Sequence, residues 1–347
     1  MIDLRSDTLT LPTEAMLAAQ ATATMVDDSR DHDPTVRKLE EASARLLGKE
    51  AGLFVASGTM GNLVALLAHG RRGGEVLIDG GAHLLRSELG GVSILGGLFP
   101  RILPARRGAL DLDALDAALV PGFTANKIPT AMVWMETTHN DAGGAVLPLE
   151  NMRAVAALAH TAAVPVHIDG ARFFNACVAL GEDPAILAAT ADSVTFCVSK
   201  GLSAPVGSVL VGNADFILRA RAYRRMVGGA MRQAGALAAA GLVALEAMVA
   251  RLPEDHRTAQ LLATGIASVA QGLVSPSETA TNIVRIDTTP SGLPAAEWVK
   301  RLERRGVRVG AWDVWQIRAV THRHIDDAAI SQAVAAFRAE WQDRTAA

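Results

Sequence analysis

A lysine lies in an apolar part of the chain, within the run SVTFCVSKGLSAPVGSVLVG from Ser193 to Gly212. Phe196 and Val198 alternate there with small or polar residues, as in a buried strand. An unpaired ammonium is costly to bury, so Lys200 needs an explanation. On this segment alone, an exposed turn after the strand is the favoured interpretation. The alternative is a nucleophilic amine that forms a Schiff base.

Polar groups follow two other predicted strands. The run VPVHIDGAR ends in Asp169 and Arg172, and the Asp169 carboxylate there could bind a metal, a ribose or a protonated ring nitrogen, or cap the next helix. The run FVASGTMGN places Ser57, Gly58 and Thr59 between a strand and a helix, where backbone N–H groups can bind an anion. By itself this turn is a weak signal, and it is neither a Walker loop nor a G-x-G-x-x-G motif.

Together, these features suit pyridoxal phosphate. Its phosphate needs hydrogen-bond donors, its pyridine nitrogen needs a carboxylate, and its aldehyde needs an amine. The turn at Ser57, the Asp169 carboxylate and the Lys200 amine supply one each. No residue spacing in the sequence indicates a zinc site, and no metal is expected.

The elements that must position these residues alternate between strands and helices. We expect strands at AGLFVA, EVLI, TAMVWME, VPVHID, SVTFCVS and SVLVG. We expect helices at NLVALLAHG, at LENMRAVAALAHTA and at DPTVRKLEEASARLLGKE, which Asp33 caps with Pro34 in its first turn. This alternation predicts an α/β domain with a mostly parallel sheet, whose strands end where ligands bind.

The second part of the chain has a different pattern. A long helical region is expected from about Phe216 to Leu252. The runs TNIVRIDT, VKRLERRGVRVGAW, VWQIRAVTH and IDDAAISQAVAAFRAEW then predict further strands and helices. We therefore expect a large domain over residues 1–251, including the N-terminal segment, and a small α+β domain over residues 252–347.

The composition predicts a soluble globular protein. Of the 347 residues, 50% are hydrophobic, which is enough for a substantial core. The net charge is −3, and basic clusters such as RARAYRR are short, so we expect no nucleic-acid partner. We interpret this cluster as a solvated helix face, with a nearby phosphate or acidic group as the alternative partner of its arginines.

Membrane attachment and secretion are not expected either. The N-terminus has no apolar run, and Ala234–Ala250 is short for a membrane span and contains Glu246. Cys177 and Cys197 lie in apolar surroundings, which suggests buried thiols in a reducing compartment. We expect a cytoplasmic protein.

In their order and spacing, the motifs resemble the threonine aldolase and aromatic amino acid β-eliminating lyase family. The resemblance runs nearly end to end, through IDLRSDTLTLPT, DDSRDHDPTVRKLE, GKEAGLFVASGTMGNLVAL, AHLLRSELGG, METTHN, HIDGARFFNA, VSKGLSAPVGSVLVG, RRMVGGAMRQAG and IRAVTH. It implies a PLP-dependent transferase-like fold of type I, with a mostly parallel central sheet flanked by helices and a small C-terminal α+β domain. It also implies a homotetramer or homodimer with shared active sites.

The resemblance assigns roles to residues around the cofactor. Lys200 matches the lysine that forms the imine with pyridoxal 5'-phosphate, and His83 matches the histidine that stacks on its ring. His83, or a water molecule near it, is then the expected base. The remaining cofactor-binding positions are Ser57, Gly58 and Thr59 at the phosphate, Asp169 and Arg172 at the ring, and Arg225 at a neighbouring subunit's phosphate. Glu88 and His139 match positions that support the site.

The resemblance also implies a set of substrate-binding residues. Ser6 and Arg318 match groups that hold the substrate carboxylate, and an arginine suits that task because it binds carboxylates bidentately. Arg172 and Arg232 match further basic groups of the site. Arg30 stands where relatives commonly have a tyrosine that lines the active site. Either Arg30 favours an acidic or larger side chain on the substrate, or another residue fills the gap.

Two more positions depart from the family pattern. Thr137 stands where relatives often have asparagine, and Asn126 aligns loosely with a pocket histidine. The expected activity is PLP-dependent retro-aldol cleavage of a β-hydroxy-α-amino acid such as L-threonine or L-allo-threonine to glycine and an aldehyde. The alternative is a β-eliminating lyase or a transaldolase that acts on a different, larger or acidic β-substituted amino acid. Two other functions are disfavoured. The sequence lacks the glycine fingerprint of an NAD-dependent oxidoreductase. A non-catalytic binding protein with this fold would have no need of Lys200.

Overall fold

The computed structural model describes residues 1–122 and 124–343, so the last four residues of the predicted small domain lie outside the described chain. The chain divides into two compact units. The larger comprises Leu11–Ala142 and Val146–Val249, and the smaller comprises Met1–Thr10, Gly143–Ala145 and Ala250–Ala347.

The prediction that the N-terminal segment belongs to the large domain is wrong. Strand β1 (Ile2–Asp3) pairs in parallel with β12 (Val307–Arg308) of the smaller unit. Leu4 follows β1 and lies in the hydrophobic core of that unit. A two-residue strand carries no periodic signal of its own, so only this pairing reveals where the segment belongs.

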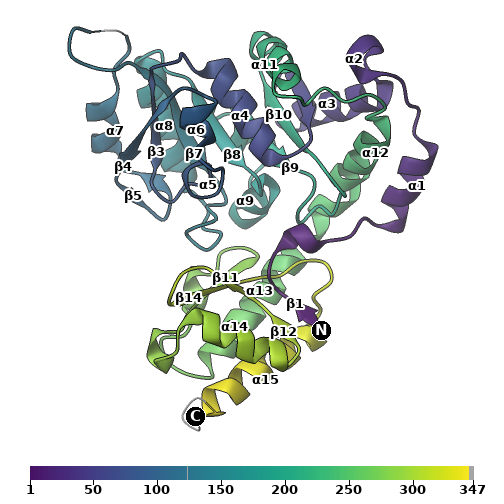
Figure 1. Ribbon diagram of the computed structural model, residues 1–347, viewed down its shortest axis with the longest axis vertical. Coiled ribbons are helices and arrows are strands. Elements are labelled where there is room, and N and C mark those ends of the chain that lie inside the picture. Colours follow the sequence, from purple (N-terminus) through teal and green to yellow (C-terminus); the bar gives the residue numbers. More distant parts are fainter. Residues whose placement is uncertain (123, 344–347) are drawn as a thin grey trace. The chain divides into compact units, whose positions relative to one another are not determined.

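The larger unit contains a seven-stranded sheet (Figure 1). Its strand order is β2-β10-β9-β8-β7-β3-β4. Strands β9, β8, β7, β3 and β4 are parallel, whereas β10 is antiparallel to both of its neighbours. The bounds are β2 (Ala51–Val55), β3 (Glu75–Asp79), β4 (Phe99–Leu103), β7 (Thr130–Glu136), β8 (Val166–Gly170), β9 (Ser193–Cys197) and β10 (Ser208–Gly212). The predicted mostly parallel sheet is confirmed.

Strand β4 lies at one edge of this sheet, and the sequence did not predict it. All of its residues are exposed except Leu103. Pro100 lies inside it, and proline is tolerated in a sheet mainly at an edge. The strand therefore lacks the continuous apolar run by which the buried strands were recognised.

Helices cover the sheet, and their ends follow local sequence signals (Figure 1). Helix α3 (Pro34–Leu46) begins as predicted, because Oδ1 of Asp33 accepts hydrogen bonds from the N–H groups of Thr35 and Val36. Further helices of this unit are α1 (Glu14–Thr22), α2 (Asp28–Asp31), α4 (Gly58–His69), α5 (His83–Arg86), α6 (Gly91–Ile94), α7 (Leu112–Ala118), α8 (Leu149–Thr161), α9 (Phe173–Leu180) and α10 (Pro184–Ala188). Strands β5 (Ala105–Arg106) and β6 (Ala109–Leu110) form a small hairpin.

The long helical region expected from Phe216 to Leu252 is interrupted. Helix α11 (Ala214–Met226) is followed by Gly228, whose φ of +83° breaks the helix, and α12 (Gly235–Val243) begins later. The helical stretch Gly235–Ala267 is long and apolar enough for a membrane span, but a core helix passes the same test. Helix α12 packs against α1 and α3.

The smaller unit is an α+β domain, as predicted. Its three-stranded antiparallel sheet has the order β11-β14-β13. Trp298 and Phe337 stack in its core with ring centroids 5.7 Å apart. The elements are β11 (Ile283–Asp287), β13 (Gly310–Ala311), β14 (Gln316–Val320), α13 (Leu252–Ala267), α14 (Ala295–Arg304) and α15 (Asp327–Asp343).

Candidate active site

Three of the predicted cofactor residues lie at or just after the ends of the neighbouring strands β8 and β9. Asp169 lies near the end of β8, is 2% exposed, and pairs in register with Thr195 of β9. Lys200 lies in the turn after β9 and is half-buried, so the turn is as predicted but its lysine is not fully exposed. Arg172 precedes α9 and is buried, with Nη1 3.5 Å from Oδ1 of Asn140.

The predicted phosphate turn forms the start of a 12-residue helix, α4. Ser57 is its N-cap and accepts a hydrogen bond of 3.2 Å from the N–H of Met60, while Ser57 and Thr59 are exposed. A Cβ at Gly58 would lie 3.0 Å from Sγ of Cys197, so glycine lets the turn pack against β9. The positive end of the α4 dipole, with two hydroxyl groups, suits a phosphate.

A continuous chain of hydrogen bonds joins His83 to Asp169. Nδ1 of His83 lies 2.9 Å from Oε1 of Glu88. The same oxygen accepts a bond of 2.8 Å from Nδ2 of Asn62, and that nitrogen also donates to Oδ2 of Asp169 at 2.8 Å. The histidine expected on the ring face and the carboxylate expected at the ring nitrogen are therefore linked through Glu88 and Asn62.

Two acidic groups control the position and charge of His83. The hydrogen bond to Glu88 raises the pKa of His83, although burial opposes the shift. Glu136, at the end of β7, accepts backbone hydrogen bonds from His83 at 2.6 Å and from Asn140 at 2.8 Å. Burial raises the pKa of Glu136, and the charge of His139 opposes this.

His139 forms a second pair beside this chain of hydrogen bonds. Its Nε2 lies 2.7 Å from Oδ2 of Asp79, and its Nδ1 accepts a bond of 3.2 Å from the N–H of Ala142. Burial lowers the pKa of His139, but the hydrogen bond to Asp79 and the charge of Glu136 together raise it. His139 therefore holds the loop after β7 through Ala142, and its supporting role in the cofactor site remains a prediction.

These residues fit pyridoxal phosphate. The α4 N-terminus supplies donors, Asp169 supplies a buried carboxylate and Lys200 a half-buried amine. Side-chain atoms of His83, Glu88 and Asp169 lie within 4.8 Å of one another, a spacing that also suits a metal ion. However, the NH₂ group of Asn62 points at both carboxylates and its positive hydrogen atoms would face a bound cation, which favours the organic cofactor.

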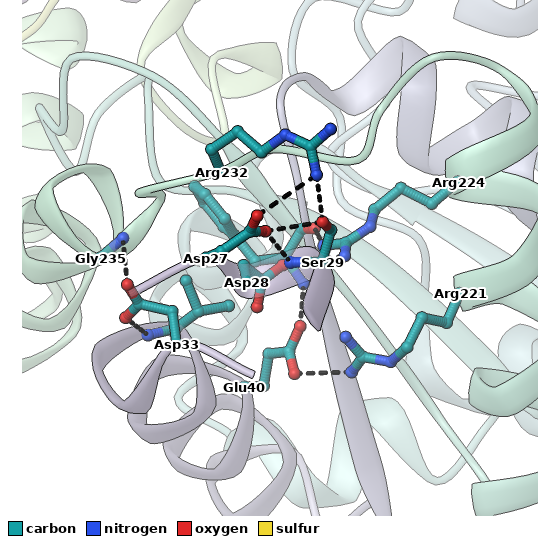
Figure 2. Close-up of polar contacts among 11 residues, drawn as sticks. Asp27, Asp28, Ser29, Asp33, Glu40, Arg221, Arg224, Arg232 and Gly235 are labelled. Carbon is teal, nitrogen blue, oxygen red and sulfur yellow. Dashed lines mark hydrogen bonds and ion pairs between the residues drawn. The ribbon is translucent and has the colours of Figure 1, made fainter. Parts of the chain in front are cut away.

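Arg30 and Arg232 each form an ion pair with Asp27. Figure 2 shows the contacts of Arg232 with Asp27 and Ser29. Nη1 of Arg232 donates to Oδ2 of Asp27 at 3.4 Å and also to Oγ of Ser29. Nε of Arg30 lies 3.8 Å from Asp27, and its side chain is 81% exposed. Arg232 thus holds the segment that presents Arg30, and the substrate-binding roles of both remain predictions.

The interpretation of RARAYRR as a solvated helix face is wrong for two of its arginines. Arg224 is buried, donates to the carbonyl of Phe54 at 2.8 Å, and pairs with Asp28 at 3.0 Å. Arg221 pairs with Glu40 at 2.7 Å (Figure 2). Arg225 is exposed, and its predicted contact with a neighbouring subunit's phosphate remains a prediction.

The predicted carboxylate-binding residues, Ser6 and Arg318, belong to the smaller unit. Oγ of Ser6 accepts hydrogen bonds from the N–H and hydroxyl groups of Thr8. Nη1 of Arg318 lies 3.4 Å from the carbonyl oxygen of Arg5, and its guanidinium lies 5.4 Å from the ring centroid of Trp312. Arg318 is thus held beside the residue that precedes Ser6.

Sequence reasoning missed Asn62, Asp79 and Glu136 as members of the site. Glu136 and Asp79 each end a parallel strand, and that position could have indicated them. Asn62 follows Thr59 by about one helical turn, so it belongs to the same helix as the phosphate turn. Its role depends on Glu88 and Asp169, which no local signal reveals.

Comparisons with known proteins agree with this arrangement. The family model described as "Beta-eliminating lyase" matches residues 3–289. The chain is 41% identical to low-specificity L-threonine aldolase 1 of Arabidopsis thaliana over 97% of its length and 95% of that protein. It is 40% identical to the low specificity L-threonine aldolase of Escherichia coli strain K12 over 98% of this chain and 99% of that one.

The fold also matches solved structures. The structure of Leishmania major threonine aldolase superimposes with a TM-score of 0.80 at 17% identity, covering 98% of this chain and 100% of that one. At that identity the match establishes the fold, and the family follows from the matched residues 3–289 and from the full-length relatives. The chain belongs to the β-eliminating lyase family.

Proposed function

We propose that the protein is a PLP-dependent lyase that cleaves L-threonine or L-allo-threonine to glycine and acetaldehyde. The main supporting observation is the grouping of the α4 N-terminus, Asp169 and Lys200 around the ends of β2, β8 and β9. The low-specificity threonine aldolases of Arabidopsis thaliana and Escherichia coli, similar along their whole lengths, support the same substrate class.

Pyridoxal phosphate, when bound, supplies an electron sink conjugated to the α-carbon of the substrate. The residues of the chain would hold it at three points. The N–H groups and hydroxyls of Ser57 and Thr59 bind the phosphate, Asp169 keeps the ring nitrogen protonated, and Lys200 holds the aldehyde carbon. Arg172 is buried and lies three residues after Asp169, and we propose it as the cation beside the phenolic oxygen.

Ser6 and Arg318 are proposed to bind the substrate carboxylate. A fixed carboxylate sets the rotation about the α-carbon, and this decides which bond of the substrate breaks. In the proposed reaction the Cα–Cβ bond breaks, the β-hydroxyl loses its proton, the aldehyde leaves, and the α-carbon gains a proton.

His83 is the proposed base for the β-hydroxyl proton. Its Nδ1 faces Glu88, an oxygen acceptor, so this nitrogen carries a hydrogen atom and Nε2 is available to accept a proton. The raised pKa of His83 means that a larger share of the imidazole is protonated at neutral pH than for an isolated histidine. The base therefore becomes fully available only above neutral pH.

The second candidate is a β-eliminating lyase or transaldolase for a larger or acidic β-substituted amino acid. The observation behind it is Arg30, whose side chain is 81% exposed although its Nε lies 3.8 Å from Asp27. A cation free to move in solvent could pair with a substrate carboxylate. Products distinguish the two candidates, because elimination yields ammonia and a keto acid.

We also propose a homotetramer or homodimer and a cytoplasmic location. Exposed apolar side chains on α6, on β4 and in the loop before α6 offer a surface for a second copy, notably Leu89, Ile94, Phe99 and Ile102. The two cysteines of the chain are free and buried, which is compatible with a reducing compartment.

The test is turnover of L-threonine and L-allo-threonine, with detection of glycine and acetaldehyde. Release of both products that depends on Lys200 supports the aldolase. Turnover that persists in Lys200→Ala would refute the proposed role of the lysine. A yellow protein that releases ammonia and a keto acid from another amino acid would instead support the second candidate.

A further inference from the structure

Asn62 contacts both carboxylates of the site. It lies on α4 and is 1% exposed. Its Nδ2 donates one hydrogen bond to Oε1 of Glu88 and another to Oδ2 of Asp169, each 2.8 Å long. The two hydrogen atoms of one amide group therefore bind two acidic groups that lie 81 residues apart in the sequence (169 − 88).

The orientation of this amide follows from the chemistry of its partners. Ionised carboxylates only accept hydrogen bonds, so the amide must turn its NH₂ group toward them. The opposite orientation would direct Oδ1 at two carboxylate oxygens. In the present orientation, Oδ1 has no hydrogen-bond partner among the described residues, and the contacts of Asn62 with its neighbours are donor contacts.

The charges around Asn62 explain why an amide is needed. Atoms of Glu88, Asp169 and His83 lie within 4.8 Å of one another. Two carboxylates at this separation repel each other, and N–H donors directed at both of them reduce that repulsion. N–H donors stabilise the ionised form of each, and only an ionised Asp169 can keep a ring nitrogen protonated.

Helix α4 also connects Asn62 to the phosphate turn. Ser57 caps this helix, and Asn62 follows a little more than one turn later. The same rigid element therefore offers donors to the phosphate at its start and donors to Glu88 and Asp169 further along. A shift of Asn62 would alter Asp169 and, through Glu88, the ring of His83.

We infer that Asn62 is a positioning residue of the cofactor site, whose neutral amide holds Asp169 and Glu88 as two separate charged acceptors. This inference rests on the proposed function, because it concerns how the residues proposed to bind pyridoxal phosphate are kept in place. Asn62 touches neither the substrate nor the phosphate in this assignment and acts through its two partners.

The test compares Asn62→Asp and Asn62→Leu with the wild-type protein. Asn62→Asp retains the size of the side chain but removes its donors and adds a third carboxylate. The cofactor is removed, pyridoxal 5'-phosphate is titrated back in the presence of EDTA, and the visible absorption of the bound cofactor is followed against pH. We expect Asn62→Asp to weaken cofactor binding about tenfold or more and to shift the pH profile of the absorption. Asn62→Leu weakens binding without adding a charge.

Asn282→Asp is the matched control. Asn282 is 0% exposed, donates to Asp7 and to the carbonyl of Thr321 at 3.2 Å each, and also has an Oδ1 without a hydrogen-bond partner among the described residues. If burying an aspartate simply destabilises the fold, both Asn62→Asp and Asn282→Asp would lose thermal stability. A changed cofactor affinity and pH profile in Asn62→Asp alone supports the positioning role.

Other outcomes separate this inference from the proposed function. Asn62→Asp with wild-type affinity and pH profile would overturn the role of Asn62. If neither Asn62 variant folds, Glu88→Gln provides the comparison. A wild-type affinity for pyridoxal 5'-phosphate and a wild-type pH profile in that variant would also overturn the role of Asn62. A wild-type protein that binds no pyridoxal 5'-phosphate would refute the proposed function itself.

Discussion

Oε1 of Glu88 lies 2.9 Å from Nδ1 of His83, and this contact is the main reason that the pKa of His83 is raised. The pair also leaves Nε2 as the atom of His83 that can accept a proton. The ionisation of His83 is therefore controlled by a residue that need not touch the substrate.

The first prediction concerns the pH dependence of turnover. If neutral His83 is the base, kcat/KM rises with pH through a pKa above the ordinary value of 6.5. Glu88→Gln removes the carboxylate that raises this pKa, so the acidic limb of the profile moves to lower pH. Measurement of kcat/KM for L-threonine against pH checks this. An unmoved limb would show that another group is the base.

The second prediction concerns Lys200. Lys200→Ala removes the amine proposed to hold the cofactor aldehyde, so we expect loss of the visible absorption and of turnover. Absorption spectra and glycine release measure both. Lys49→Ala is the control, because Lys49 is also partly buried and the proposed cofactor site does not include it; its Nζ donates to the carbonyl of Ala191 at 2.6 Å. Equal loss of colour in both variants would contradict the assignment of Lys200.

The third prediction concerns Arg30 as a selector of substrate charge. Its side chain is 81% exposed, so Arg30→Tyr should change the stability by no more than about 0.5 kcal/mol. If Arg30 pairs with a substrate carboxylate, the variant loses about tenfold in kcat/KM for β-hydroxyaspartate, with little loss for L-threonine. The ratio of the two values measures this. A ratio that does not change would make Arg30 an ordinary loop residue.

The fourth prediction concerns the buried pair of Arg224 and Asp28. The Arg224 side chain is 4% exposed, and Asp28 is equally enclosed at 2%. Asp28→Ala leaves the guanidinium buried without its partner, which should cost about 3–5 kcal/mol of unfolding free energy. Urea denaturation measures this. Arg225→Ala is the comparison, because Arg225 is exposed on α11. An equally small loss of unfolding free energy in both variants would contradict the argument from burial.

The fifth prediction concerns acid stability. Nε2 of His69 and Nδ1 of His167 each lie 2.7 Å from Oγ of Ser193, and Nε2 of His167 lies 3.3 Å from the Thr195 hydroxyl. The single hydroxyl hydrogen of Ser193 can go to only one of the histidines, so the other must donate to Oγ. The ring that accepts this hydrogen must therefore be neutral, and a proton added to its accepting nitrogen would break that hydrogen bond.

Burial lowers the pKa of His69 to about 4 and that of His167 well below its ordinary value. The unfolded chain then binds more protons than the folded chain below pH 6.5. Stability is lost as the pH falls from 6.5 toward 4, and His69 alone accounts for about 3 kcal/mol. Urea denaturation at pH 7 and pH 5 measures the loss. The same free energy at both values would contradict the prediction.

Local signals in the sequence were sufficient for most elements, and the cofactor-binding roles that the resemblance added remain predictions. Asp33 caps α3 because its carboxylate reaches N–H groups two and three residues later. The apolar runs of β8 and β9 end at Asp169 and just before Lys200, and parallel strands bring such ends to one edge. Motif order along the chain was then enough to indicate the family.

The tertiary structure decided the features that depend on distant partners. Arg224 pairs with Asp28, which lies 196 residues away in the sequence, and Asn62 donates to Asp169, which lies 107 residues away. Periodicity and capping depend on residues within a few positions, so they could not show that Arg224 is buried or that Asn62 joins two carboxylates. The first strand likewise joined the smaller unit only through its pairing with β12. The sequence by itself therefore determined most elements and the family, and only packing decided which charges are buried together.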